Sequence, residues 1–476
     1  MHHTPIDQKP LAREGVFNVK YTVVIAAIAA LGGLLFGYDW VVIGGAKPFY
    51  EAYFHLTTAQ QVGWANSCAL LGCLLGSLAA GLSGDRFGRK RLLVAAAVLF
   101  AISSVLTGLA FSFFAFVFWR IVGGVAIGIA SNVSPTYIAE ISPAPWRGRL
   151  VSLNQVTIVG GILLAQVMNW LIADRVPEAA TAQFIRDSWN GQIGWRYMFL
   201  AVAVPSALFF ISAIFVPESP RWLVSRGREK QALAVFLRIG TPNYALTAVR
   251  DIKDALADEI EKESMWRGFG LHALRPVLLI GVVLAVLQQW SGINVLFNYA
   301  EEIYRAAGYG VNDVLFNIVI TGAINVAFTL VAFGVVDRWG RRRLMLLGCA
   351  GIALSHLFLG TSYRLGLKGL PVLLLTLMTI GCYAMSLAPV TWVIISEIFP
   401  TRIRGTGVAI SVSTLWIAAF LLTFSFPILN EGLGQAGTFW LYSGICAAGF
   451  LFIYSFVPET KGKTLEQIER EIVKAG

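Results

Sequence analysis

Two ionisable residues lie well inside long apolar stretches of the chain, Asp39 in 22–45 and Arg120 in 114–139. Both would lie roughly 10 Å below the same membrane surface if the stretches are helices that rise about 1.5 Å per residue, so they can meet. An intramembrane charge is costly enough that a functional role with a named partner is the default hypothesis. An Asp with a reference pKa near ~3.9 stays charged beside a guanidinium, and it takes up a proton when it loses that partner or is desolvated. The pair therefore predicts a proton-binding site, with a structural ion pair as the alternative.

Amide and aromatic side chains form a second polar set inside apolar stretches. They are Gln155, Gln288, Gln289, Asn294, Asn325 and Trp392. Amides both donate and accept hydrogen bonds and an aromatic ring offers an apolar face, so the set suits a ligand with many hydroxyl groups. A lone amide in such a stretch more often joins two helices. Gly292 and the Ala388–Pro389 pair predict helix breaks beside these residues.

The stretches that carry these residues are long enough to cross a lipid bilayer. Hydrophobic residues make up 57% of the 476-residue chain and charged residues 13%, against roughly 25% charged in a soluble domain. A spanning helix needs about 20 apolar residues and satisfies its own backbone hydrogen bonds. We therefore expect an all-α membrane protein. Its twelve spans would be roughly 22–45, 61–83, 92–110, 114–139, 150–172, 197–216, 274–299, 313–336, 344–361, 371–396, 406–429 and 438–457.

Basic residues predict the orientation of these spans. Lys and Arg number twelve in the loops at 84–91, 140–149, 337–343 and 397–405, against six in the loops on the other side. The positive-inside bias places the first set of loops and both termini in the cytoplasm. The net charge of +10 follows mostly from this bias and from contact with anionic lipid headgroups, so it requires no nucleic-acid partner.

A charged phrase occurs twice, as GDRFGRKR at 84–91 and VDRWGRRR at 336–343. Two further phrases recur in the same order, AEISPAPWRG with SEIFPTRIRG and PESPRWL with PETKGKTL. The chain is thus an internal tandem repeat of two six-helix bundles with the same orientation. Such repeats are typical of transporters in which two bundles rock around a central site. The expected parts are an N-terminal segment at 1–21, bundles at 22–216 and 274–457, a cytoplasmic helical linker at 217–273 and a tail at 458–476.

The repeated phrases place carboxylates and arginines at the cytoplasmic ends of several helices. Because arginine can bridge two carboxylates bidentately, we expect a gate network that holds these ends together in one state and breaks in the other. Static anchoring of the helix ends is the alternative. The members would be Asp85, Arg89, Glu140, Arg147, Glu218, Asp337, Arg341, Glu397, Arg404 and Glu459.

The remaining features predict no covalent chemistry. The five cysteines fall in expected spans without metal-ligand spacing, and His55, His272 and His356 occur singly. We expect no catalytic residue, no metal and no cofactor. Segments 228–239 and 248–263 predict short amphipathic helices in the linker, and 464–475 in the tail resembles them, with a solvated linker as the alternative.

These motifs make the chain resemble the sugar porter family of the major facilitator superfamily, and most closely its bacterial xylose–proton symporter type. The resemblance rests on GGLLFGYD, GDRFGRKR, YIAEISPAPWRG, PESPRWL, QQWSGIN, VVDRWGRR, APVTWVIISEIFP, RIRG and PETKGKTLEQIE, which span nearly the whole chain. It implies alternating access and a sugar or polyol substrate. Asp39 and Arg120 match the proton-coupling positions. The sugar-contacting positions match at Gln155, Gln288, Gln289, Asn294, Asn325 and Trp392, with Phe36 and Trp416 at aromatic positions beside the site.

Two departures from the family pattern limit the choice of substrate. Asn298 stands where tyrosine is common, and Leu415 stands where an amide often precedes Trp416. A hexose, a pentose or a less polar relative all fit. We expect a proton-coupled monosaccharide symporter; the alternatives are a passive sugar or polyol facilitator and, more remotely, a transporter-like sugar sensor. The expected partners are a sugar, a proton and membrane lipid, and the expected setting is the bacterial cytoplasmic (inner) membrane, with the protein acting as a monomer.

Overall fold

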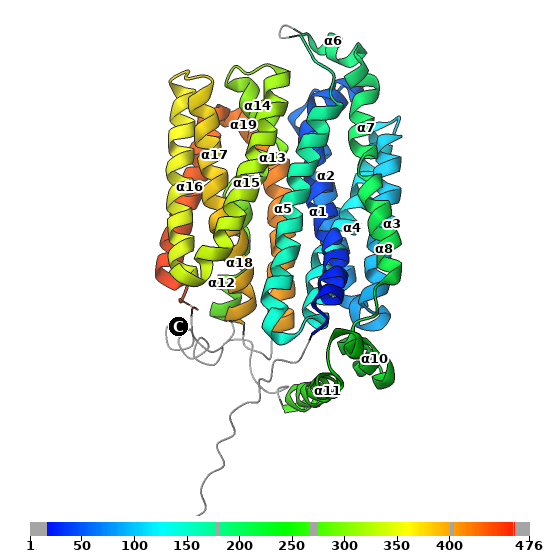
Figure 1. Ribbon diagram of the computed structural model, residues 1–476. Coiled ribbons are helices and arrows are strands. Elements are labelled where there is room, and N and C mark those ends of the chain that lie inside the picture. The colour runs from blue at the N-terminus through cyan, green and yellow to red at the C-terminus, as the bar shows by residue number, and fades with distance from the viewer. Residues whose placement is uncertain (1–16, 178–179, 266–274, 400–403, 460, 462–476) are drawn as a thin grey trace, which may run out of the picture.

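Helices make up almost all of the computed structural model, which describes residues 17–177, 180–265, 275–399, 404–459 and 461 (Figure 1). The first half consists of α1 (Val19–Phe54), α2 (Ala59–Phe87), α3 (Arg89–Gly108), α4 (Phe113–Ile141), α5 (Ala144–Ile172), α6 (Ala182–Asp187), the π-helical turn η1 (Asn190–Gly194), α7 (Trp195–Leu200) and α8 (Ala203–Phe215). The linker contains α9 (Pro220–Ser225), α10 (Glu229–Ile239) and α11 (Pro242–Met265). The second half consists of α12 (Arg275–Trp290), α13 (Ile293–Asn298), α14 (Ala300–Ala306), α15 (Val311–Trp339), α16 (Arg341–Arg364), α17 (Leu370–Met385), α18 (Leu387–Ile398) and α19 (Arg404–Phe456).

The number of membrane crossings agrees with the sequence prediction. Within the described ranges, 11 helical segments are long and apolar enough to cross a bilayer. The last of them, Thr406–Phe456, contains two crossings because Gly434, with φ 67° and ψ 173°, interrupts the helix. Glycine adopts this left-handed backbone without a Cβ penalty. The twelve expected spans are therefore present.

The two ends of the helical bundle differ in the short helices that they carry (Figure 1). The linker end carries α10 and α11, and the α6 end lies opposite. The linker helices were predicted as amphipathic and are confirmed: Val235, Phe236 and Ile239 of α10 are buried against α9 and α11. The predicted tail helix at 464–475 lies outside the described residues.

Side-chain caps fix where several helices begin. The Thr58 hydroxyl accepts a hydrogen bond from the Gln61 backbone N–H at 3.3 Å. In turn, the Gln61 side-chain oxygen accepts one from the Thr58 backbone N–H at 3.4 Å, so α2 begins with a capping box. Ser112 caps α4 in the same way by accepting from the Ala115 N–H at 3.2 Å. These turns direct the apolar helices back across the bundle.

The halves meet mainly where α2 packs on α19 and α5 packs on α15. Glycine allows close approach at this interface, because a Cβ at Gly63 would lie 2.4 Å from the Phe424 carbonyl oxygen. A Cβ at Gly44 of α1 would lie 2.5 Å from the Phe297 carbonyl oxygen of α13. Helix backbones in membrane proteins approach closely at such small residues. The central site described next lies between the two halves.

Candidate functional site

A cavity of about 350 Å³ lies between the halves. All eight residues expected to bind the sugar line it: Phe36, Gln155, Gln288, Gln289, Asn294, Asn325, Trp392 and Trp416. They come from both halves, on α1 and α5 and on α12, α13, α15, α18 and α19. The structure thus gathers into one cavity residues that are far apart in the sequence.

Helix breaks border this cavity. Gly292, with φ 85°, separates α12 from α13, as the sequence predicted. The other break was predicted at Pro389 but occurs earlier, at Ser386, where φ is −126° and ψ is −85°. Pro389 lies in the first turn of α18, where its missing N–H has no helical partner to lose. The break therefore precedes the proline.

The amides on α12 and α13 are hydrogen-bonded to one another. Gln289 Nε2 donates to Gln288 Oε1 at 3.1 Å, and Asn294 Nδ2 donates to Gln289 Oε1. Gln288 Nε2 also reaches the Ala388 carbonyl at 3.3 Å. Among the residues described, Gln155 and Asn325 form no side-chain hydrogen bond with another residue, so their amides are free for a ligand. The cavity thus combines a fixed amide group with two free amides.

Asp39 and Arg120 form the predicted buried ion pair. Arg120 Nη1 donates to Asp39 Oδ1 at 3.0 Å and to the Asp39 carbonyl at 3.2 Å, and the residues are 2% and 3% exposed respectively. Asp39 Oδ2 and Arg120 Nε have no hydrogen-bond partner in the described part of the chain. Neither side chain lines the cavity, but the next residue, Trp40, does. The pair thus lies between α1 and α4, and α1 also lines the cavity through Trp40.

A second buried ion cluster, at the α6 end, was not predicted. Lys47 of α1 is 1% exposed, and its Nζ lies 2.6 Å from Glu302, 3.1 Å from Glu51 and 3.7 Å from Glu301. Arg305 pairs with Glu301 at 2.9 Å. The first span was predicted to end at residue 45, which left Lys47 in a loop, whereas α1 continues to Phe54. The i, i+4 spacing of Lys47 and Glu51 was the available signal for a longer helix.

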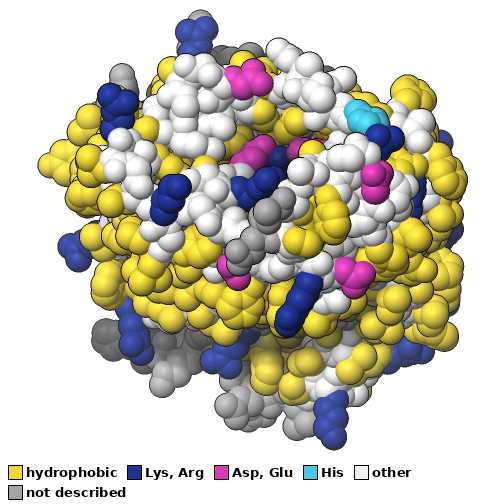
Figure 2. All heavy atoms as spheres, turned by 90° about the horizontal axis from the view of Figure 1, so that it is seen from above, with side chains coloured by type: hydrophobic (Ala, Val, Ile, Leu, Met, Phe, Trp, Pro, Cys, Tyr) yellow, Lys and Arg dark blue, Asp and Glu magenta, His cyan; other side chains and the backbone are white. Residues whose placement is uncertain are grey.

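This cluster joins the two halves. Glu302 lies on α14, outside the spans, and burial raises the pKa of its carboxyl while Lys47 opposes the rise. Acidic and basic side chains gather in a hollow on this face (Figure 2), where a cavity of about 580 Å³ is lined by Lys47, Glu51, Glu301 and Glu302 among others. Nearby, the Asn312 amide of α15 accepts from the Val176 N–H at 3.0 Å and donates to its carbonyl at 2.9 Å. The halves are therefore in contact at the α6 end.

At the linker end, the repeated phrases build the same local structure twice. Gly88 has φ 89° and Gly340 has φ 88°, and each precedes the next long helix. Glu218 accepts from the backbone N–H groups of Arg89 and Lys90 at 2.9 and 3.0 Å. Glu459 accepts from the N–H of Arg341 in the same way, at 2.9 Å. Each carboxylate thus serves the N-terminus of a helix, where backbone donors lack partners.

At the linker end, each half also contains ion pairs between an arginine and carboxylates of the same half. Arg89 lies 3.1 Å from both Asp85 and Glu140, and Arg341 lies 3.8 Å from Glu397. Arg147, another expected member of the gate network, is exposed and forms no ion pair with a residue that the structure describes. Glu140 pairs with Arg89 and accepts a hydrogen bond from the Ser219 hydroxyl. The side chains of Asp337 and Arg404 lie outside the described part.

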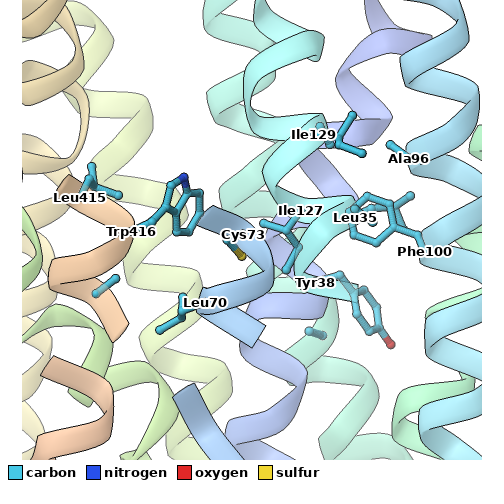
Figure 3. Close-up of a cluster of buried hydrophobic side chains, with 14 of the residues drawn as sticks. Leu35, Tyr38, Leu70, Cys73, Ala96, Phe100, Ile127, Ile129, Leu415 and Trp416 are labelled. Atoms are coloured by element: carbon cyan, nitrogen blue, oxygen red, sulfur yellow. The ribbon is translucent and has the colours of Figure 1, made fainter. Parts of the chain in front are cut away.

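The two departures from the family pattern occupy different places. Leu415 lines the cavity, whereas Asn298 is buried away from it, with Oδ1 unpartnered among described residues. Figure 3 shows Leu415 and Trp416 on α19, with the Trp416 indole turned toward the first half. The missing amide at Leu415 therefore bears directly on the ligand.

Comparison with known proteins assigns the family. Residues 25–472 match the family described as "Sugar (and other) transporter". The chain belongs to this sugar transporter family, within the major facilitator superfamily. It is 37% identical over 484 residues to the D-xylose-proton symporter of Escherichia coli (strain K12), covering 95% of this chain and 96% of that relative. It is 34% identical over 476 residues to the arabinose-proton symporter of Bacillus subtilis (strain 168), covering 100% of both.

Solved structures agree with this assignment. An inward-open conformation of the xylose transporter from E. coli has a TM-score of 0.83 and 37% identity, covering 95% of this chain and 100% of that one. A partially occluded inward-open conformation has a TM-score of 0.82 and 36% identity, covering 94% and 100%. As a sugar transporter family member, the chain is a multi-pass integral membrane protein with the predicted fold.

Proposed function

We propose that the protein is a proton-coupled symporter that carries a monosaccharide, a pentose or a hexose, by alternating access. The observation that carries the proposal is the central cavity, where amides and aromatic rings from both halves surround a space next to the buried Asp39–Arg120 pair. Amides and rings suit a polyhydroxylated ring. The xylose and arabinose relatives, which are named as proton symporters, support the coupling to a proton.

Asp39 would bind the transported proton. In the paired state Arg120 favours the charged carboxylate, whereas protonation removes that attraction and releases the guanidinium. Asp39 Oδ2, which no described group contacts by a hydrogen bond, offers the position for the proton. Because Asp39 and Trp40 are neighbours on α1, a shift of α1 when the pair breaks would also move the cavity surface.

Alternating access requires that one end of the molecule closes while the other opens. Here the halves are in contact at the α6 end through Lys47–Glu302 and Asn312–Val176, whereas the described arginine pairs at the linker end lie within one half. Together with the likeness to inward-open structures, this supports an inward-facing state. The two moving bodies would be 22–216 and 274–457, and the predicted gate network would tighten at the linker end in the outward-facing state.

The linker end would face the cytoplasm. The excess of Lys and Arg in its loops supports this orientation, with both termini inside, in a bacterial cytoplasmic membrane. Both halves of the cavity come from one chain, so the proposal needs only a monomer embedded in lipid. It assigns the chain no catalytic step.

The decisive experiment is sugar transport in proteoliposomes, comparing the wild type with Asp39→Asn and, as a matched control, with Asp187→Asn on the exposed surface of α6. Counterflow measures exchange, and uptake driven by a pH gradient measures coupling. We expect Asp39→Asn to keep exchange and lose accumulation, because an amide cannot carry the proton. Asp187→Asn should behave as wild type. Equal accumulation by wild type and Asp39→Asn would refute the coupling, and transport of no sugar would refute the substrate class.

A further inference from the structure

Three aromatic rings form one surface of the central cavity. Phe36 and Trp40, four residues apart on α1, stack with ring centroids 5.2 Å apart and planes inclined by 27°. Trp416 of α19 lies 5.8 Å from Trp40 and 6.0 Å from Phe36. The three rings, called here the aromatic wall, therefore contact one another across the boundary between the halves. Trp40 was not among the predicted site residues.

Trp40 adds an apolar surface where the cavity has few hydrogen-bonding groups. The amides Gln288, Gln289 and Asn294 come from α12 and α13, whereas α1 contributes rings to the cavity. The residue before Trp416 is Leu415, which also lines the cavity and offers no hydrogen bond. The cavity is thus divided chemically into amide-bearing helices and a largely apolar wall.

The polar groups of the wall are the indole N–H donors of Trp40 and Trp416, both at ring edges. Trp416 Nε1 is buried and has no acceptor among the described residues. A buried unpartnered N–H is costly, and a ligand oxygen at the edge of the ring would satisfy it. The faces of the rings, by contrast, can only contact carbon-bound hydrogens or exclude water.

We propose that Trp40 is a specificity-determining residue that contacts the sugar through its ring face; this inference rests on the proposed sugar transport. It selects pyranoses whose hydroxyl groups are all equatorial, because these present a flat face of C–H groups to the aromatic wall. An axial hydroxyl on that face would be stripped of water without gaining a partner. Turning the sugar over would move the hydroxyl groups away from their amides. We therefore expect roughly tenfold or greater preference over an axial epimer.

The test compares two epimer pairs that differ at C4, D-glucose with D-galactose and D-xylose with L-arabinose. Dissociation constants are measured by calorimetry on purified protein, and counterflow in proteoliposomes is measured alongside. The variants are Trp40→Ala, Trp40→Phe and Trp40→Gln, with Trp440→Ala, a partly exposed tryptophan outside the cavity, as the control. Thermal unfolding of each variant identifies any that fail to fold.

The wild type should bind the equatorial member of each pair about tenfold more tightly or better. Trp40→Ala should bring the ratio close to one, and Trp40→Phe should keep most of it because a ring face remains. Trp40→Gln should raise the relative affinity of the axial epimer by supplying a hydrogen bond, and Trp440→Ala should leave the ratio unchanged.

The inference and the proposed function can fail separately. If the wild type transports both members of a pair equally, or if Trp40→Ala weakens both members equally and keeps their ratio, Trp40 only packs and the inference is overturned while sugar transport stands. If no sugar of any kind is bound or transported, the proposed function falls and this inference falls with it.

Discussion

Glu218 and Glu459 show how a single carboxylate can stabilise the start of a helix. Each accepts hydrogen bonds from backbone N–H groups at the start of α3 or α16, just after a glycine with positive φ. Glycine is favoured at position 88 because φ is 89°, and a Cβ there would also displace the Glu218 carboxylate from its capping position. At the residue scale, the repeated phrases therefore encode a helix cap as well as arginine pairs.

Removing this cap should destabilise the protein. Glu218→Ala leaves two N–H groups of α3 without an acceptor and removes a negative charge from the helix N-terminus, which costs about 1–2 kcal/mol. We expect a lower unfolding temperature in detergent. The control is Glu229→Ala, which removes an exposed ion pair with Lys253 and a negative charge from the first turn of α10. It leaves no side-chain cap broken, so it should change stability by less than about 1 kcal/mol. Equal unfolding temperatures for Glu218→Ala and wild type would show that the cap contributes nothing.

At the scale of elements, the short helix α14 links the second half to α1. Its Glu302 contacts buried Lys47, and burial raises the pKa of Glu302 in this closed arrangement. In an opened arrangement Glu302 would meet water and return toward an ordinary pKa near ~4.3. Glu302 thus binds a proton more readily in the closed arrangement than in the opened one. Lowering the pH from neutral toward the ordinary pKa of a glutamate should therefore favour closure of the α6 end. Lys47 keeps Glu51 and Glu301 as partners when Glu302 is protonated.

This pH dependence can be measured as a distance between spin labels on Gln183→Cys of α6 and Lys368→Cys, one in each half, after the native cysteines are replaced. The short-distance population should grow as the pH falls. Glu302→Gln, which mimics the protonated carboxyl, should show the short distance already at neutral pH and respond less to acid. A response that is unchanged in Glu302→Gln would assign the effect to another group.

At the scale of the whole molecule, the close approach of α1 and α13 sets how tightly the halves can close. Gly44→Ala places a methyl carbon 2.5 Å from the Phe297 carbonyl oxygen, so the helices must separate. We expect longer distances between the same two labels and slower sugar exchange. Gly160→Ala on α5, where nothing lies within 4 Å of the added methyl, is the matched control. Unchanged distances in Gly44→Ala would mean that the interface yields without opening.

The fold and the cavity residues were predictable for a physical reason. A bilayer demands long apolar helices, and within them amides and charges such as Gln288, Asp39 and Arg120 are conspicuous because they are costly. Trp40 carried no such signal, since an aromatic residue in a span suits lipid, protein core or cavity equally well. Only the three-dimensional structure, in which Trp40 contacts Trp416 and lines the cavity, distinguishes these surroundings.

The boundaries and side-chain partners of the helices were less predictable than the helices themselves. Lys47 was missed because apolar runs mark the bilayer, whereas helices such as α1 continue beyond it. The break before α18 was misplaced because proline is tolerated in the first turn that follows a break. The sequence also could not show which arginine pairs with Glu140, since the nearest one along the chain, Arg147, is exposed and Arg89 approaches from another helix.

The two caps have a consequence for how this chain arose. Glu218 lies after the last helix of the first half, and Glu459 lies after the last helix of the second, yet each reaches back to the helix that begins at Arg89 or Arg341. An ancestral gene copy that ended at its sixth helix would have left that earlier helix uncapped. The ancestral unit therefore extended past its final span to include the Pro-Glu phrase, and fusion joined the copies downstream of it.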